Sequence, residues 1–191
     1  MERISNEEIA RILGRYIEGK DENRPEILKR IYAPDARVLF DLRTTTITFP
    51  PEIRTNDAIA EVLSADFNRR FVSPRTYYLE ECSREPGDNA VRNLPWLVIM
   101  RESATGRTRV GWGLYDWFFA LCPGQAPEWK IALHRICIQE MMDREDRDGA
   151  LLDNLQSALS HPWPTPAEIQ GLPGVWPALN TEGFPPKKDE G

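Results

Sequence analysis

The sequence predicts an α+β fold in which N-terminal helices lie on one face of a curved antiparallel sheet, so that helices and sheet enclose a conical pocket. Three observations predict this class. Apolar residues recur with helical spacing early in the chain, strand-like segments separated by turn signals follow, and helices succeeded by a run of strands are typical of α+β proteins. The 191 residues are 41% apolar and 28% charged, which is the balance of one globular domain.

The first helix is predicted to begin at Ser5. Ser5 and Glu8 have the spacing of a capping box, which satisfies free backbone amides at a helix start. The apolar residues that follow fall on one helical face: Ile9, Ile12, Leu13, Tyr16 and Ile17. Gly19 and the polar residues after it are expected to end this helix.

Two further helices are expected before the main run of strands. A short one starts near Pro25, a residue favoured in a first helical turn, and ends before Pro34, because the residue preceding a proline avoids the helical region. The other begins near Thr55 or Asn56. Its buried face is formed by Ile59, Val62, Leu63 and Phe67.

Strands are predicted where β-forming residues lie between turn signals. They cover residues 36–43, 76–79, 94–101, 107–121 and 131–138. The last three are expected to be consecutive antiparallel strands with hairpin-like connections. Residues 44–51 are also β-prone, but Pro50 and Pro51 interrupt them.

These patterns divide the chain into a domain of residues 1–142, a C-terminal helical segment of residues 143–160 and a proline-rich tail of residues 161–191. The leucines of the C-terminal helix share one face: Leu151, Leu152, Leu155 and Leu159. The tail also carries Trp163, Trp176 and Phe184. A purely solvated linker has little use for large aromatic side chains, so we expect part of the tail to pack on the domain or on a partner.

Composition excludes several classes of function. A net charge of −6 argues against nucleic acid and against an anionic membrane as partners. No apolar run approaches the about 20 residues of a membrane helix, and the polar helix at the N-terminus does not resemble a signal peptide. The three cysteines make no disulfide framework, so a cytoplasmic location is expected. With two histidines, a metal site is not expected.

Several short motifs occur together and in a characteristic order. The segment 27–38, with Ala33-Pro34-Asp35-Ala36-Arg37-Val38 at its end, resembles the helix-to-strand entry of the nuclear-transport-factor-2-like (NTF2-like) superfamily. Asn56-Asp57-Ala58-Ile59 at the third helix and the three long strands fit the same order. The resemblance covers about residues 5 to 140. It implies the cone-shaped α+β fold found in ketosteroid isomerases and SnoaL-like polyketide cyclases.

The comparison with ketosteroid isomerase implies roles for particular residues. Arg15-Tyr16-Ile17 matches the motif whose tyrosine donates to an oxyanion, and Asp116-Trp117-Phe118 is similar to the motif that holds a protonated aspartic acid. The position of the family's general base is occupied by Phe40. Asp41 lies one residue further on, which in a strand is the opposite face. The resemblance therefore implies two hydrogen-bond donors without that base.

Asp116, Tyr16 and His134 are the candidate catalytic residues. Asp116 shares a strand face with apolar side chains, where lost solvation raises the pKa of a carboxyl group unless it is paired. Tyr16 lies in the apolar stripe of the first helix, and His134 has apolar neighbours in the last strand. Each has a structural alternative: an aspartate paired with arginine or tyrosine, a core tyrosine, and a structural histidine. Some dehydratases of the superfamily use a His–Asp pair, so His134 with Asp116 is a further alternative.

The resemblance implies a pocket for a hydrophobic, carbonyl-bearing molecule such as a polyketide, steroid or terpenoid. The apolar wall is expected to consist of Val38, Phe40, Trp112, Leu114 and Phe118. One interpretation is a cofactor-independent isomerase, cyclase or dehydratase. The alternatives are a binding module that performs no reaction and a protein-interaction domain.

A homodimer through the sheet face is expected, as is common in the superfamily. Tyr115, Trp117 and Phe119 alternate with the pocket-facing residues and would otherwise form an exposed aromatic patch. The same patch is also a candidate docking place for the aromatic tail.

Overall fold

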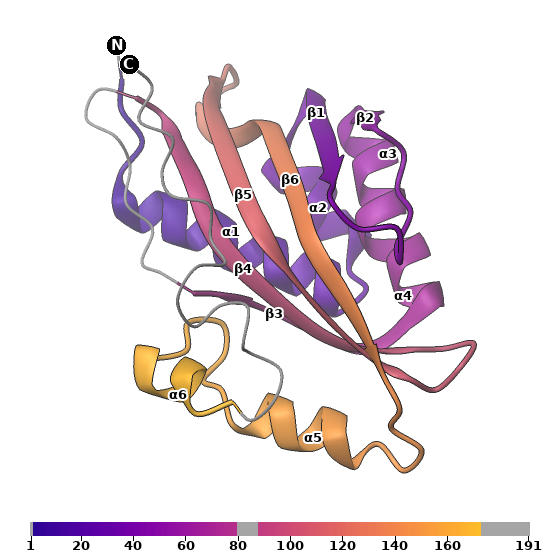
Figure 1. The fold of residues 1–191 in the computed structure, drawn as a ribbon. Coiled ribbons are helices and arrows are strands. Elements are labelled where there is room, and N and C mark those ends of the chain that lie inside the picture. Colours follow the sequence, from indigo (N-terminus) through magenta and orange to yellow (C-terminus); the bar gives the residue numbers. More distant parts are fainter. Residues whose placement is uncertain (1, 80–87, 173–191) are drawn as a thin grey trace.

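A computed structural model describes residues 2–79 and 88–172. A curved six-stranded sheet in the order β2-β1-β6-β5-β4-β3 forms its centre (Figure 1). The strands are β1 (Tyr32–Leu42), β2 (Glu52–Arg54), β3 (Phe71–Tyr78), β4 (Ala90–Glu102), β5 (Thr108–Cys122) and β6 (Glu128–Arg144). β1 pairs with β6 in parallel, and the other neighbouring pairs are antiparallel, including the expected consecutive β4, β5 and β6.

The N-terminal helices cover one face of this sheet, which we call the inner face (Figure 1). They are α1 (Asn6–Asp21), α2 (Pro25–Ile31), α3 (Asn56–Ala60), the π-helical turn η1 (Glu61–Asp66) and α4 (Phe67–Arg70). The hydroxyl oxygen of Ser5 accepts a hydrogen bond from the Glu8 amide at 3.1 Å, as the capping pattern predicts. α1 continues to Asp21, past the end expected at Gly19.

The opposite face, which we call the outer face, carries α5 (Ala150–Ser157) and α6 (Pro166–Gln170) (Figure 1). A second, smaller core joins these helices to the sheet: Tyr77, Leu97, Ile99, Val110, Leu152, Leu155, Leu159 and Leu172. The Asp146 carboxylate fixes the start of α5, because it accepts hydrogen bonds from the amides of Leu151 and Leu152 and from the Thr108 hydroxyl. The expected C-terminal helix is therefore present, and it packs on β3, β4 and β5.

Side chains along β5 alternate between the two faces as predicted. However, the set expected to line the pocket lies on the outer face, and the set expected on the open face lies on the inner face. Tyr115, Trp117 and Phe119 point toward the N-terminal helices and are buried in the main core. The expectation that they form an exposed dimerisation patch is wrong. Both faces of β5 are apolar, so the sequence period alone does not tell which face meets α1.

Residues 43–51 form a loop between β1 and β2. The β-prone run makes no strand before Glu52, because Pro50 and Pro51 lack the amide that a sheet ladder needs. Ile47 is nevertheless buried in the core, and Phe49 stacks on Phe40 with 4.5 Å between ring centroids. The loop therefore lies over the interior of the cone.

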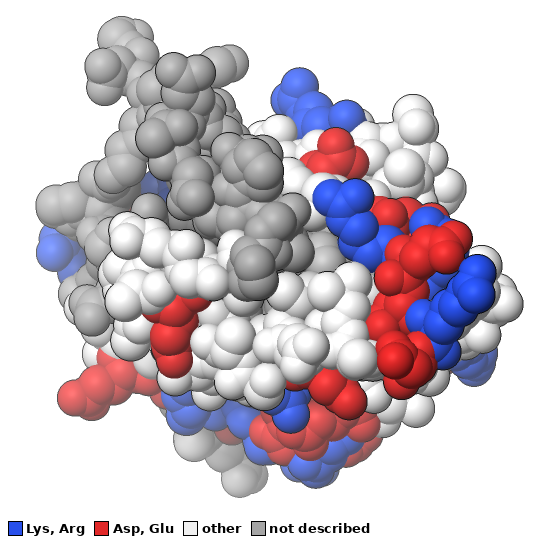
Figure 2. Space-filling model, turned by 60° about the horizontal axis from the view of Figure 1, so that its bottom comes forward, with Lys and Arg blue, Asp and Glu red and all other residues white. Residues whose placement is uncertain are grey.

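The charged side chains on the face shown in Figure 2 alternate in sign, with basic and acidic groups next to each other. Arg107 illustrates this pairing, because its guanidinium contacts Asp143 at 2.6 Å and Glu145 at 2.8 Å. Within residues 2–79 and 88–172, none of the helices has the length and apolar character needed to cross a membrane. Cys82, Trp176 and Phe184 lie outside the described residues.

Candidate functional site

A narrow pocket lies between the inner face of the sheet and the N-terminal helices. Its lining is almost entirely aromatic and aliphatic: Tyr16, Lys20, Phe40, Ile47, Phe49, Leu63, Phe67, Trp96, Val98, Met100, Tyr115, Ile136, Ile138 and Met141. Its volume is about 30 Å³ when measured for the centres of water molecules, which is room for about two of them. A ring-sized ligand therefore requires lining side chains to move. Phe49 and Ile47 belong to the loop of residues 43–51 and are the lining groups outside helices and strands.

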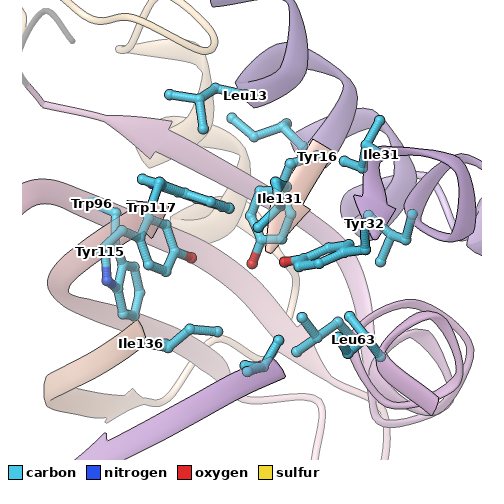
Figure 3. Close-up of a cluster of buried hydrophobic side chains, with 14 of the residues drawn as sticks. Leu13, Tyr16, Ile31, Tyr32, Leu63, Trp96, Tyr115, Trp117, Ile131 and Ile136 are labelled. Carbon is cyan, nitrogen blue, oxygen red and sulfur yellow. The ribbon is translucent and has the colours of Figure 1, made fainter. Parts of the chain in front are cut away.

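Tyr16 and Tyr115 bring phenolic groups into this pocket from α1 and β5. Figure 3 shows the hydroxyl group of Tyr16 turned toward that of Tyr32. The Tyr16 hydroxyl is fully buried and forms no well-aligned hydrogen bond among the described residues, although the Tyr115 hydroxyl lies near enough to interact with it. Burial raises its pKa well above the ordinary value, and the neighbouring Tyr115 and Tyr32 add to the shift. Tyr16 therefore stays protonated and can donate a hydrogen bond to a ligand.

His134 is fully buried next to Tyr16 and Tyr115, but unlike these two residues it does not line the pocket. Its ring stacks on Trp117 with 3.6 Å between centroids and meets the Tyr16 ring edge-on at 5.3 Å. Nδ1 lies 2.8 Å from the Tyr32 hydroxyl, whereas Nε2 has no hydrogen-bond partner in the described part of the chain. Burial lowers the pKa of His134 well below its ordinary value, so the imidazole is neutral at neutral pH.

The tautomer of His134 decides whether its Nε2 is a hydrogen-bond acceptor or a donor. When Nδ1–H donates to the Tyr32 oxygen, Nε2 is a free base, and when the Tyr32 hydroxyl donates to Nδ1, Nε2–H is a free donor. In both cases Tyr32 fixes one ring nitrogen and leaves the other for proton exchange.

Unsatisfied polar atoms are concentrated in this region. Within the described residues they include the Tyr16 hydroxyl, His134 Nε2 and the indole nitrogens of Trp96 and Trp117. All four side chains contact one another directly or through the ring of Tyr115. A buried donor or acceptor without a partner costs about 1–3 kcal/mol of stability, and folded proteins contain few of them. Four of the six such atoms found in the described residues are therefore gathered beside one pocket.

A buried ion pair contributes the charged lining group. Lys20 and Asp21 have side chains that are 8% and 5% exposed, and Lys20 Nζ lies 2.8 Å from Asp21 Oδ1. Thr76 on β3 completes the network: its amide donates to Asp21 at 2.6 Å, and Lys20 donates to its hydroxyl oxygen at 2.9 Å. Lys20 Nζ also lies 4.1 Å from the centre of the Phe67 ring. The positive charge of Lys20 is thus matched by Asp21 at the pocket wall.

Some of the residues expected in the site lie together. Tyr16, Phe40 and Val38 face the interior of the cone, as does His134, which is the β6 partner of Val38. Tyr16 and Phe40 line the pocket directly. The catalytic roles of Tyr16 and His134 stay predictions, now with a shared location.

Asp116, Trp112, Leu114 and Phe118 lie on the outer face, because they alternate with the buried Tyr115 and its neighbours along β5. These four residues therefore do not line the inner pocket, and no pair of Asp116 with His134 forms. Leu114 and Asp116 line a separate pocket on the outer face, and a catalytic role of Asp116 stays a prediction. Asp116 instead accepts a hydrogen bond at 2.8 Å from the amide of Asn93, which sits in a bulge of β4 with a positive φ of 54°. The carboxylate satisfies a backbone group that the sheet ladder leaves free.

Sequence reasoning missed Lys20, Asp21 and Thr76. Lys20 follows Tyr16 by four residues and therefore continues the apolar stripe of α1, which is a signal for burial. It was overlooked because Lys20 and Asp21 read as the polar end of the helix. Thr76 bonds Lys20 and Asp21 because β3 packs beside α1, and the spacing of apolar residues in the sequence does not predict which helix a strand packs against.

This arrangement can hold an uncharged or weakly polar molecule against apolar walls. Tyr16 and Lys20 offer hydrogen-bond donors, and the neutral imidazole of His134 is the nearby group able to exchange a proton. Among the residues that the structure describes, no cluster of histidine, cysteine and carboxylate side chains is suited to a metal ion.

Comparisons with known proteins agree on the fold. An NTF2-like superfamily protein from Salmonella enterica serovar Typhimurium has a TM-score of 0.56 at 15% identity, covering 76% of this chain and 94% of that one. A protein from Novosphingobium aromaticivorans, provisionally designated a scytalone dehydratase, has a TM-score of 0.56 at 17% identity, covering 74% and 88%. The hexachlorocyclohexane dehydrochlorinase LinA-type3 from Novosphingobium barchaimii has a TM-score of 0.57 at 12% identity, covering 72% and 88%.

No protein-family model matches the sequence, and no curated protein matches it. The likeness therefore concerns the fold: helices on the inner face of a curved sheet. This chain has the NTF2-like α+β cone fold.

Proposed function

We propose that the protein binds a small, mainly apolar molecule with a carbonyl or hydroxyl oxygen in the cone, and that it catalyses a proton transfer on this molecule without a cofactor. The observation that carries the proposal is the group of unsatisfied buried atoms, above all the Tyr16 hydroxyl and His134 Nε2, beside an apolar pocket. Isomerisation, cyclisation and elimination all need such a transfer. The hexachlorocyclohexane dehydrochlorinase among the structural neighbours shows that this fold accommodates an enzyme.

The proposed chemistry uses two groups of the chain. Nε2 of neutral His134 removes a proton from the carbon beside the ligand carbonyl, and the electron pair of that C–H bond moves onto the carbonyl oxygen. The Tyr16 hydroxyl donates a hydrogen bond to the resulting enolate oxygen, in surroundings where a lone donor is strong. The imidazolium then returns the proton to another carbon, so that the histidine ends as it began. Tyr32 holds the imidazole in place through Nδ1.

A single-ring ketone tests the proposal. Cyclohex-3-enone rearranges to cyclohex-2-enone when one proton moves from C2 to C4, and the conjugated product is followed by its ultraviolet absorbance. We expect the protein to accelerate this reaction. His134→Gln should reduce the rate by about 100-fold or more, and Tyr16→Phe by about 10- to 100-fold.

Cys137→Ser is the matched control, because Cys137 lies on the same strand as His134 but on the outer face. It should retain the wild-type rate. An acceleration that survives His134→Gln would contradict the assigned base. Ketone binding without any acceleration would support the second candidate function.

That second candidate is a binding protein that performs no reaction. It is favoured by the composition of the pocket wall, which contains Lys20 but neither a histidine nor a carboxylate. His134 is not part of this wall, and its ring contacts those of Tyr16 and Tyr115, which are. The turnover assay above separates the two functions, since both require binding and one requires His134 as a base.

A further inference from the structure

The ion pair of Lys20 and Asp21 sets the electrical character of the pocket. Lys20 is the charged residue in the lining, and Asp21 holds its ammonium group at 2.8 Å from a carboxylate oxygen. Other charged groups lie near the loop of residues 43–51. Arg109 donates to the carbonyl of Thr46 and is paired with Glu102 at 2.9 Å, and Arg70 donates to the carbonyl of Thr48 and lies 5.9 Å from the centre of the Phe49 ring. Among the residues that line the pocket directly, Lys20 carries the charge, and Asp21 compensates it.

Lys20 keeps one donor for a ligand. An ammonium group has three N–H bonds, and two of them have acceptors here, Asp21 Oδ1 at 2.8 Å and Thr76 Oγ1 at 2.9 Å. Nζ lies 4.1 Å from the centre of the Phe67 ring, which is part of the pocket wall, and the third N–H has no acceptor among the described residues. It can donate to a ligand oxygen while the charge stays matched by Asp21.

We propose that Asp21 makes the pocket selective for uncharged ligands, with Lys20 as the hydrogen-bond donor that recognises their oxygen. This inference rests on the proposed function, because it names the ligand class of the same pocket. A carboxylate ligand would add a buried negative charge to a pair that is already neutral, and an uncompensated buried charge costs several kcal/mol. A ketone, phenol or alcohol accepts the free N–H without that cost. Asp21 is thus a specificity-determining residue that acts through Lys20.

Three probes of similar size test the selectivity by ligand-observed ¹⁹F NMR titration. They are 4-fluoroacetophenone, a neutral ketone; 4-fluorobenzoate, an anion; and 4-fluorotoluene, which has no oxygen. The wild-type protein should bind the ketone at least about tenfold more tightly than the benzoate. Asp21→Asn leaves the Lys20 charge without its counter-ion, so benzoate affinity should rise by about tenfold or more and overtake that of the ketone.

Lys20→Met is the second variant. It removes the donor and keeps the two hydrogen bonds of Thr76 to Asp21, at 2.6 and 3.0 Å, so it tests the inference even if Asp21→Asn does not fold. The ketone should then lose its advantage over 4-fluorotoluene, while benzoate stays excluded.

The outcomes distinguish the two proposals. Equal affinity of the wild type for ketone and benzoate, or no gain of benzoate binding in folded Asp21→Asn, overturns the selectivity and leaves the pocket intact. A ketone preference that persists in Lys20→Met overturns the role of Lys20. Binding of none of the three probes overturns the ligand pocket itself, and the selectivity with it.

Discussion

A histidine that is fully buried among aromatic rings, as His134 is, must fold in its neutral form. The stacked ring of Trp117 and the edge-on ring of Tyr16 replace the water that would solvate an imidazolium. One hydrogen bond, to Tyr32, orients the ring and leaves Nε2 unsatisfied. Keeping such a group unsatisfied behind the wall of a pocket costs stability, and the proposed function explains the cost as preparation for a ligand.

This burial predicts a dependence of stability on pH. The pKa of His134 is well below 6.5 in the folded protein, because burial disfavours the charged form, whereas the unfolded chain has the ordinary value near 6.5. As the pH falls below 6.5, His134 binds a proton in the unfolded chain but stays neutral in the folded protein. The contribution of neutral His134 is therefore complete above pH 6.5 and is lost as the pH falls toward the folded pKa, by up to about 1.4 kcal/mol per pH unit.

Urea unfolding at pH 7.5, 6.5 and 5.5 measures this dependence. The loss of stability at low pH should be smaller in His134→Gln. His161→Gln is the control: partial burial also lowers the pKa of His161, but this residue is classed as exposed, so its substitution should change the pH dependence less. An equally steep loss of stability in His134→Gln would show that another group controls this pH range.

At the scale of elements, the junction between β6 and α5 depends on one carboxylate. Asp146 accepts hydrogen bonds from the amides of Leu151 and Leu152, both at 3.0 Å, and from the Thr108 hydroxyl at 2.6 Å. These bonds join the start of α5 to β5. Burial acts to raise the pKa of Asp146, but the hydrogen bonds from Thr108, Leu151 and Leu152 outweigh this effect, so the pKa is lowered.

Asp146→Ala should lower the free energy of unfolding by about 1.5–3 kcal/mol, because hydrogen bonds to a charged group are lost and the Thr108 hydroxyl is left buried. Asp148→Ala is the matched control, since exposed Asp148 accepts a single bond from Ala150 at 3.2 Å, and it should cost less than about 1 kcal/mol. Chemical unfolding of both variants provides the comparison. Similar losses in the two variants would mean that α5 is held by its leucines alone.

The elements themselves were largely predictable from the sequence, and their partners were not. The capping residue Ser5, the stripe through Tyr16 and the alternation in β5 all appear in the structure as expected. The face of β5 that meets α1 could not be predicted, because Trp117 and Phe118 on opposite faces are equally apolar. For the candidate site, Tyr16 and His134 lie in the interior of the cone as predicted, whereas Asp116 lies on the outer face; the catalytic roles of all three stay predictions. Lys20 was missed because a charged residue near a helix end reads as solvated.

At the scale of the whole molecule, the sheet separates two cores of different character. The inner core holds the pocket and its unsatisfied polar atoms, and the outer core joins α5 and α6 to β3, β4 and β5 through aliphatic and aromatic contacts (Figure 1). The outer helices cover part of the face through which a homodimer was expected. The homodimer stays a prediction, but the exposed aromatic patch on which it depended is buried in the inner core.

The central claim is that a ligand in the cone reaches the inner polar cluster. Long-range ¹H–¹⁵N spectra of protein labelled only at histidine test it directly, because the chain has two histidines and His161→Gln assigns them. Addition of 4-fluoroacetophenone should shift the Nε2 resonance of His134 and leave the signals of His161 unchanged. A ketone that binds, as its ¹⁹F signal reports, while both nitrogens of His134 keep their positions would contradict the account.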